Sequence, residues 1–143
     1  MTDEKHIRIG FFNDFKGEDS ILISADIYGL LELEKIFNQL SKKSTEFELS
    51  NTKFIDPEFN IGIKMSSTDL NSGLKQVNGN YVWNLTKNKW SEIRDQASGL
   101  YKNGTNGHHY LDSESEINDD LQIVLSLNEY DMGFWKKENS IEN

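Results

Sequence analysis

The chain has 143 residues, enough for one hydrophobic core and too few for two, so we expect one domain over residues 1–143. Its 24 acidic and 15 basic residues give a formal charge of −9, which disfavours binding to phosphate backbones and predicts no nucleic-acid partner. The absence of cysteine excludes disulfides and thiolate metal sites, and no run approaches the roughly 20 apolar residues of a membrane span, so we expect a cytoplasmic protein without a membrane partner.

The first half of the chain predicts several short strands and one helix. Apolar residues at helical spacing over residues 26–43 indicate an amphipathic helix, and Asp26 is placed to cap its start. Leu30 and Leu31 both belong to its apolar stripe. Residues 13–19 are rich in turn formers and should be a loop. Alternating or continuous apolar residues predict strands at 7–12, 20–25, 47–49 and 61–65.

The second half begins with a hairpin signal. Asn78-Gly79 supplies the two positive φ values of a type I′ turn between two strand-like runs. A second amphipathic helix is expected over residues 89–102, with Asn88 as its cap. The strands expected in this half lie at 74–77, 81–85, 108–112 and 121–127.

These elements predict an α+β fold, with two amphipathic helices on one face of a mostly antiparallel sheet of about six to eight strands. Strand–helix–strand order occurs twice, at residues 20–50 and 81–112, but the side chains of the two halves are too different to argue a duplication. Residues 1–5 and 132–143 show no periodicity and are expected to fray. Trp135, in that tail, either contacts a partner or folds back on the sheet.

The segment around two adjacent histidines is the first candidate for a chemical site. On a strand, His108, Tyr110 and Asp112 share one face and His109 lies on the other. A histidine and a carboxylate on one face can ligate a metal or form an acid–base pair. A catalytic metal site usually needs three protein ligands, and the only other histidine is His6, so we expect no metal and no cofactor.

An acidic segment follows directly, with five carboxylates among the nine residues 112–120. It lacks the central glycine and the final glutamate of a calcium-binding loop. Two interpretations remain: a solvated charged loop, or an electrostatic docking surface for a basic partner. The candidate partner-binding residues are Tyr110, Asp112, Glu114, Glu116, Asp119 and Asp120.

One resemblance to a known class of proteins covers about the last third of the chain. The residues that carry it are Trp90 and Leu100 of the second helix, Gly107-His108-His109-Tyr110-Leu111-Asp112, the acidic segment, and Ser126-Leu127-Asn128-Glu129-Tyr130. This order resembles the C-terminal part of bacterial immunity proteins, which bind and neutralise the toxin domains of polymorphic or contact-dependent toxin systems. The resemblance implies a non-enzymatic protein without catalytic residues, acidic because many such toxin domains are basic nucleases.

The leading hypothesis is therefore an inhibitor-type binding protein whose acidic surface covers a basic toxin domain. The chain contains no Gly-x-Ser-x-Gly nucleophile motif and no phosphate-binding glycine loop, so we expect no enzyme. The alternative hypothesis is a small-molecule-binding or hydrolytic domain that uses His108, Tyr110 and Asp112. A symmetric dimerisation module, with a large apolar patch, is a third possibility.

Overall fold

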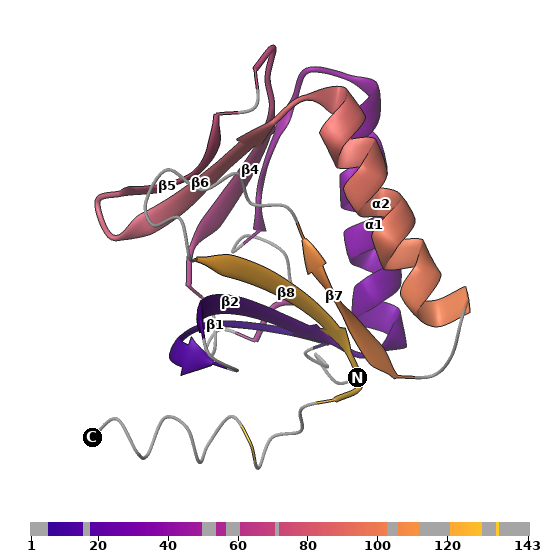
Figure 1. Ribbon diagram of the computed structural model, residues 1–143. Helices are drawn as coiled ribbons and strands as arrows, with labels where there is room; N and C mark the ends of the chain where they lie inside the picture. The colour runs from indigo at the N-terminus through magenta and orange to yellow at the C-terminus, as the bar shows by residue number, and fades with distance from the viewer. Residues whose placement is uncertain are drawn as a thin grey trace.

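A computed structural model describes residues 6–15, 18–49, 54–56, 61–70, 72–102, 106–111, 121–129 and 134. These residues form an α+β fold, which confirms the predicted class. Apart from Phe134, the segments expected to fray lie outside the described residues. In chain order the elements are β1 (Ile7–Phe15), β2 (Glu18–Ala25), α1 (Ile27–Lys42), β3 (Glu46–Glu48), β4 (Ile63–Ser67), β5 (Gly73–Val77), β6 (Asn80–Leu85), α2 (Lys87–Lys102), β7 (Gly107–Leu111) and β8 (Gln122–Leu127) (Figure 1).

The strands divide into two four-stranded sheets, where the sequence suggested a single one. Sheet A has the strand order β1-β2-β8-β7, and sheet B has the order β3-β4-β6-β5. In each sheet the central pair is parallel and the two outer pairs are antiparallel. The two helices pack side by side on one side of the molecule (Figure 1). Local sequence patterns report strands but not their distant partners, which is why they did not predict the division.

The two halves of the chain have the same topology. Each half is a hairpin, a helix and a second hairpin, and exchanging the halves converts the strand order of sheet A into that of sheet B. α1 starts at residue 27 and α2 at residue 87, a shift of 60, and both have 16 residues. The same shift relates the parallel pair Ile21–Ile123 of sheet A to Tyr81–Ile63 of sheet B. The fold is therefore pseudo-twofold symmetric, and each sheet takes one hairpin from each half.

The two helices bury equivalent positions against each other and against the sheets. Phe37 of α1 stacks on Trp90 of α2, with ring centroids 5.9 Å apart, and Trp90 meets Trp83 of β6 edge-on at 4.9 Å. The indole Nε1 of Trp90 donates a hydrogen bond to the carbonyl oxygen of Ser66, which ties α2 to sheet B. At a shift of 60, the buried helix residues pair as Leu30 with Trp90, Leu33 with Ile93, Phe37 with Ala97, and Leu40 with Leu100.

The helix starts and the hairpin turn follow local chemistry. The Asp26 side chain accepts a hydrogen bond from the backbone N–H of Gly29 at 2.9 Å, which confirms the predicted cap of α1. Asn78 and Gly79 have φ values of 52° and 84°, which confirms the predicted turn between β5 and β6. The prediction of Asn88 as the cap of α2 is wrong, because the helix begins earlier and the Thr86 hydroxyl accepts from the N–H of Lys89.

The first turn is also tighter than predicted. Residues 13–19 were expected to form a loop, but β1 continues to Phe15 and β2 begins at Glu18. The register shifts between Phe12 and Phe15, so the strands extend through a β-bulge. Turn-forming residues occur both in loops and in irregular strand ends, so the composition of this stretch could not distinguish the two.

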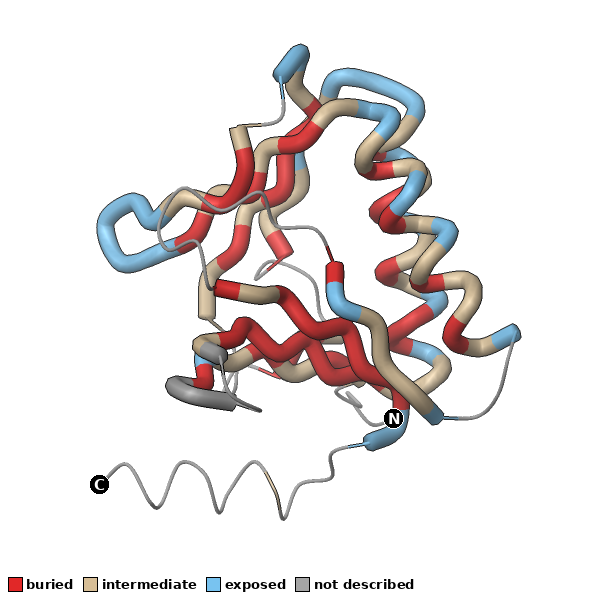
Figure 2. Tube along the Cα trace, in the orientation of Figure 1, coloured by how far each residue is buried: buried red, intermediate tan, exposed pale blue. Residues whose placement is uncertain are grey.

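The outer faces of the two sheets differ (Figure 2). In sheet A the outward residues Leu22 and Val124 are buried, and β2 and β8 are covered on both faces, as continuous apolar strands usually are. Among the described residues, Phe134 reaches this face and its ring lies 5.6 Å from that of Phe12. In sheet B the equivalent positions hold Val82 and Lys64, which are only half-buried. The pseudosymmetry therefore covers the core but not the outer faces of the sheets.

Removing the Phe37 ring tests the helix crossing. Phe37 is fully buried, so Phe37→Ala should lower the free energy of unfolding by about 3–5 kcal/mol, measured by urea titration. The half-exposed Val77 serves as the control, because Val77→Ala should change this free energy by less than about 0.5 kcal/mol. A loss below about 1 kcal/mol for Phe37→Ala would contradict a close-packed helix crossing.

Candidate binding surface

Tyr110 is the one predicted partner-binding residue that the structure describes. It lies on β7, an edge strand of sheet A, and 49% of its surface is exposed. Its ring packs edge-on against that of His108, with centroids 5.4 Å apart and an interplanar angle of 86°. Its carbonyl oxygen lies 3.5 Å from the side-chain amide of Gln96 on α2. The His108 ring thus orients the exposed aromatic side chain, while Gln96 lies near the strand backbone at the same residue.

His108 shares a carboxylate with a serine hydroxyl. Its Nδ1 lies 3.0 Å from Oε1 of Glu129, which also accepts a hydrogen bond from the Ser126 hydroxyl at 2.8 Å. In a nucleophilic site the histidine would accept the serine proton, but here the serine donates to the carboxylate. This cluster joins β7 to the end of β8. Its third member, Glu129, was not a sequence candidate, because a lone glutamate after a strand gives no recognisable signal.

The acidic segment itself, with Asp112, Glu114, Glu116, Asp119 and Asp120, lies outside the described residues. The two residues that flank the segment are described and buried: Leu111 is 4% exposed and Leu121 is 6% exposed. Leu111 pairs with Ile123, so the two flanking residues lie at the same end of the β7–β8 pair. Its role in partner binding stays a prediction.

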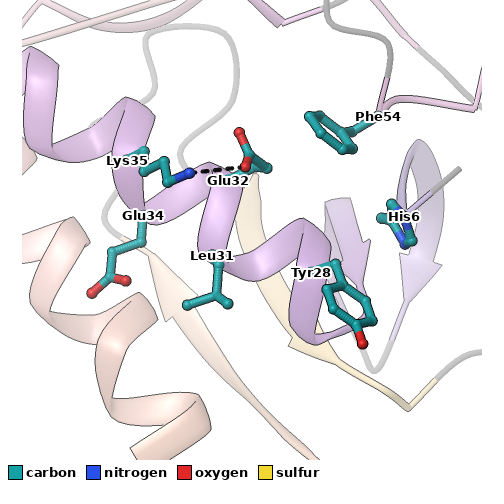
Figure 3. A pocket seen from close by; sticks show the side chains of 7 residues that line it. All are labelled: His6, Tyr28, Leu31, Glu32, Glu34, Lys35 and Phe54. Atoms are coloured by element: carbon teal, nitrogen blue, oxygen red, sulfur yellow. Dashed lines mark hydrogen bonds and ion pairs between the residues drawn. The ribbon is translucent and has the colours of Figure 1, made fainter.

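A half-open hollow of about 450 Å³ lies beside α1 and is lined by that helix together with His6 and Phe54 (Figure 3). Tyr28 and Leu31 border it and are 64% and 36% exposed. The exposure of Leu31 corrects the sequence analysis, which placed it in the buried stripe of the helix. The buried stripe consists of Leu30, Leu33, Ile36, Phe37 and Leu40, and Leu31 lies outside it. The residues that line the hollow are His6, Tyr28, Leu31, Glu32, Glu34, Lys35 and Phe54.

One wall of this hollow is built around His6. Its Nδ1 lies 2.6 Å from Oδ2 of Asp26, the residue that caps α1. The imidazole packs against the rings of Tyr28 and Phe54, at centroid distances of 5.4 and 5.8 Å. Gly29 permits this approach, because a Cβ there would come within 2.5 Å of the backbone oxygen of His6. The start of β1 and the start of α1 are therefore held together by close backbone packing and one polar pair.

A second hollow, of about 570 Å³, lies over the outer face of sheet B. Its lining is mostly hydroxyl and amide groups, and an ion pair between Lys64 and Glu46 crosses it at 3.1 Å. Both charged side chains are well exposed, so the pair contributes little to stability. Neither hollow is lined by His108 or Tyr110.

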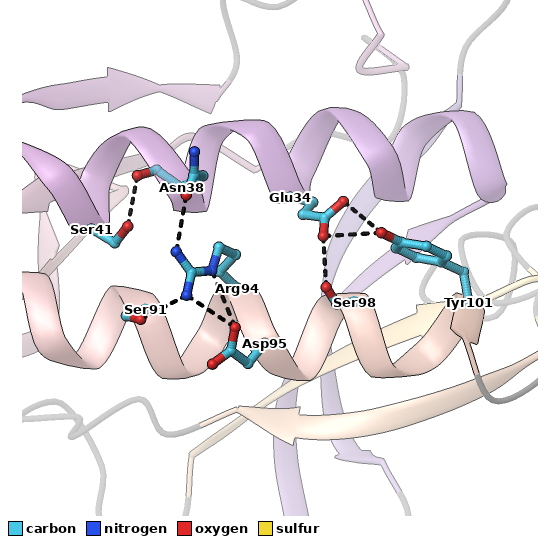
Figure 4. Close-up of polar contacts among 8 residues, drawn as sticks. All are labelled: Glu34, Asn38, Ser41, Ser91, Arg94, Asp95, Ser98 and Tyr101. Atoms are coloured by element: carbon cyan, nitrogen blue, oxygen red, sulfur yellow. Dashed lines mark hydrogen bonds and ion pairs between the residues drawn. The ribbon is translucent and has the colours of Figure 1, made fainter.

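Polar contacts between the helices obey the pseudosymmetry (Figure 4). Arg94 of α2 donates to the side chain of Asn38 on α1 at 2.9 Å. At a shift of 60, the equivalent pair is Ser98 and Glu34, and the Ser98 hydroxyl donates to the Glu34 carboxylate at 2.6 Å. Tyr101 also donates to Glu34, at 2.9 Å, and this hydrogen bond together with burial raises the pKa of its phenol above the ordinary value of 10.0.

Within the described residues, no group of three His, Cys, Asp or Glu side chains could hold a metal ion. No helix in this part of the chain is long and apolar enough to cross a membrane. Comparison with known proteins finds no matching family model, no similar curated protein and no similar solved structure.

The Glu34 contacts predict how Tyr101 titrates. The raised pKa means that this hydrogen bond stabilises the fold fully below about pH 10 and is lost as the pH rises through the folded-state pKa. Glu34→Gln should therefore lower the pKa of Tyr101, measured by ultraviolet titration at alkaline pH. Glu32→Gln, two residues away, is the control and should leave it unchanged. An unaltered Tyr101 pKa in Glu34→Gln would show that burial alone sets the shift.

Proposed function

We propose that this chain is a non-enzymatic binding protein of the bacterial immunity type, which neutralises a cognate toxin domain in the cytoplasm through an acidic surface. The observation that carries the proposal is the position of Tyr110, an exposed aromatic side chain on an edge strand, two residues before the first of five carboxylates. Aromatic side chains supply much of the binding energy of protein interfaces. The formal charge of −9 would speed encounter with a basic domain.

The described contacts do not favour the hydrolytic alternative. It needs a histidine able to take a proton from a nucleophile or from water within a pocket. His108 instead faces the Glu129 carboxylate that also holds the Ser126 hydroxyl, and it is absent from the lining of both hollows. A packing role between β7 and the end of β8 accounts for these contacts.

The direct test is a binding experiment with the C-terminal domain of the protein encoded immediately upstream of this chain. The proposal predicts a 1:1 complex by size-exclusion chromatography and calorimetry, and loss of the toxin domain's activity in the complex. Tyr110→Ala should weaken the complex by about 10-fold or more, corresponding to a loss of about 1.4 kcal/mol or more of binding free energy. Leu70→Ala, at an even more exposed apolar side chain, is the control and should not weaken it. No complex with the upstream domain would refute the proposal.

The salt dependence of the association rate shows whether the acidic charge steers a partner or only keeps the protein soluble. Association should slow steeply between 0.1 and 1 M salt, because the Debye length falls from about 10 Å to about 3 Å. Dissociation should change much less, since buried apolar contacts are not screened. Neutralising the five carboxylates of segment 112–120 to their amides should flatten the salt dependence of the association rate, as measured by stopped flow.

The matched control neutralises five carboxylates elsewhere, at Glu46, Glu48, Asp69, Glu92 and Asp95, and so has the same net charge. It should keep most of the steep salt dependence if the position of the charges matters. Equal salt slopes for the two neutralised proteins would remove segment 112–120 from the interface.

A further inference from the structure

The pseudosymmetry separates residues that the fold requires from residues that it does not. At a shift of 60, the exposed Tyr28 and Leu31 of α1 correspond to Asn88 and Ser91 of α2. Four buried positions are apolar in both helices, whereas the two surface positions of Tyr28 and Leu31 are apolar in α1 alone. Helix packing therefore does not need Tyr28 or Leu31, since α2 packs equally well with polar residues there. Neighbouring exposed apolar side chains that form a patch are typical of interaction sites.

The same face of α1 combines aromatic and acidic groups. Tyr28, Glu32 and Lys35 follow one another at i, i+4 and i+7, so they lie along one side of the helix (Figure 3). His6 and Phe54 extend the aromatic wall next to Tyr28. A hollow of about 450 Å³ is within the range of sites that hold a ligand group or a partner's side chain.

Of the two carboxylates that line the hollow, Glu32 is the one that can exchange its cationic partner. Glu34 points toward α2, where it accepts from Ser98 and Tyr101 (Figure 4). Glu32 is paired only loosely, through Lys35 at 3.2 Å, and the Lys35 side chain is 71% exposed. Such an exposed pair is worth at most about 1 kcal/mol, so an incoming cation can displace the lysine. Guanidinium groups suit this setting, because they stack on aromatic rings and bind carboxylates through two hydrogen bonds.

We infer that the hollow beside α1 is a docking site for an arginine side chain presented by a partner protein. The guanidinium stacks on Tyr28 and takes the Glu32 carboxylate from Lys35, while the aliphatic stem packs on Leu31. The residues that line the hollow come from α1 and from His6 and Phe54, with none from β7 or α2, whereas Tyr110 lies on β7, which packs against α2. It is therefore distinct from the surface proposed above and does not depend on that surface being correct.

A peptide titration followed by NMR tests the site without the partner. The probe is acetyl-Gly-Arg-Gly-amide, and its control is the same peptide with citrulline, which has the shape of arginine without its charge. We expect saturable amide shifts in residues 28–35 and at Phe54, with a millimolar dissociation constant for the arginine peptide. The citrulline peptide should bind at least about fivefold more weakly.

Variants of the chain give effects of opposite sign. Tyr28→Ala and Glu32→Gln should each lower the affinity for the arginine peptide by about fivefold or more. Lys35→Ala should raise this affinity by about two- to threefold, because it frees the Glu32 carboxylate from its ion pair. Asn88→Ala and Ser91→Ala, at the equivalent positions of α2, are the matched controls and should change nothing.

Three results would overturn the inference: shifts that do not saturate at tens of millimolar peptide, equal binding of the arginine and citrulline peptides, or shifts centred outside α1 and Phe54. Weaker binding after Lys35→Ala would also count against it, because the lysine would then be supporting the site instead of competing for it. Tyr28 and Lys35 are both largely exposed, so these variants should fold.

Discussion

The packing of α1 against α2 is the contact on which the rest of the structure depends. Each sheet takes one hairpin from each half of the chain, so neither half carries a complete sheet of its own. The helices meet where the halves meet, with Phe37 against Trp90 inside and the two equivalent polar pairs outside. Phe37 of α1 corresponds to the small Ala97 of α2, and Leu30 of α1 to the large Trp90, so the two helices fill one shared space with complementary side chains.

Local sequence patterns predicted the elements well and their assembly poorly. Apolar spacing located both helices, Asp26 marked the start of α1, and Asn78-Gly79 marked a hairpin, because each of these signals depends on neighbours within a few residues. The parallel pairings that close the two sheets join strands about 20 to 100 residues apart, and no local pattern encodes them. The repeated strand–helix–strand order was visible, but only the register showed that a constant shift of 60 relates the halves.

The candidate surfaces were harder still to predict. Tyr110 could be found because it sits next to a run of carboxylates, whereas Tyr28 looked like any tyrosine near a helix start. Its exposure became meaningful only beside Asn88, the residue at the equivalent position of α2. His108 shows the reverse case. Its histidine-rich strand suggested chemistry, and its contacts with Glu129 are those of a packed polar cluster. Comparing equivalent positions of the two halves thus separates residues that the packing requires from residues that it does not.

The central claim is that this chain binds a basic protein through Tyr110 on the edge of sheet A and through the acidic segment that follows it in the sequence. Hydrogen exchange of the chain, alone and in complex with the domain encoded upstream, tests this claim most directly. The account predicts slower exchange on binding in residues 107–120, with little change in β3 and β4 of sheet B. Protection centred on the outer face of sheet B, with residues 107–120 exchanging as before, would contradict it.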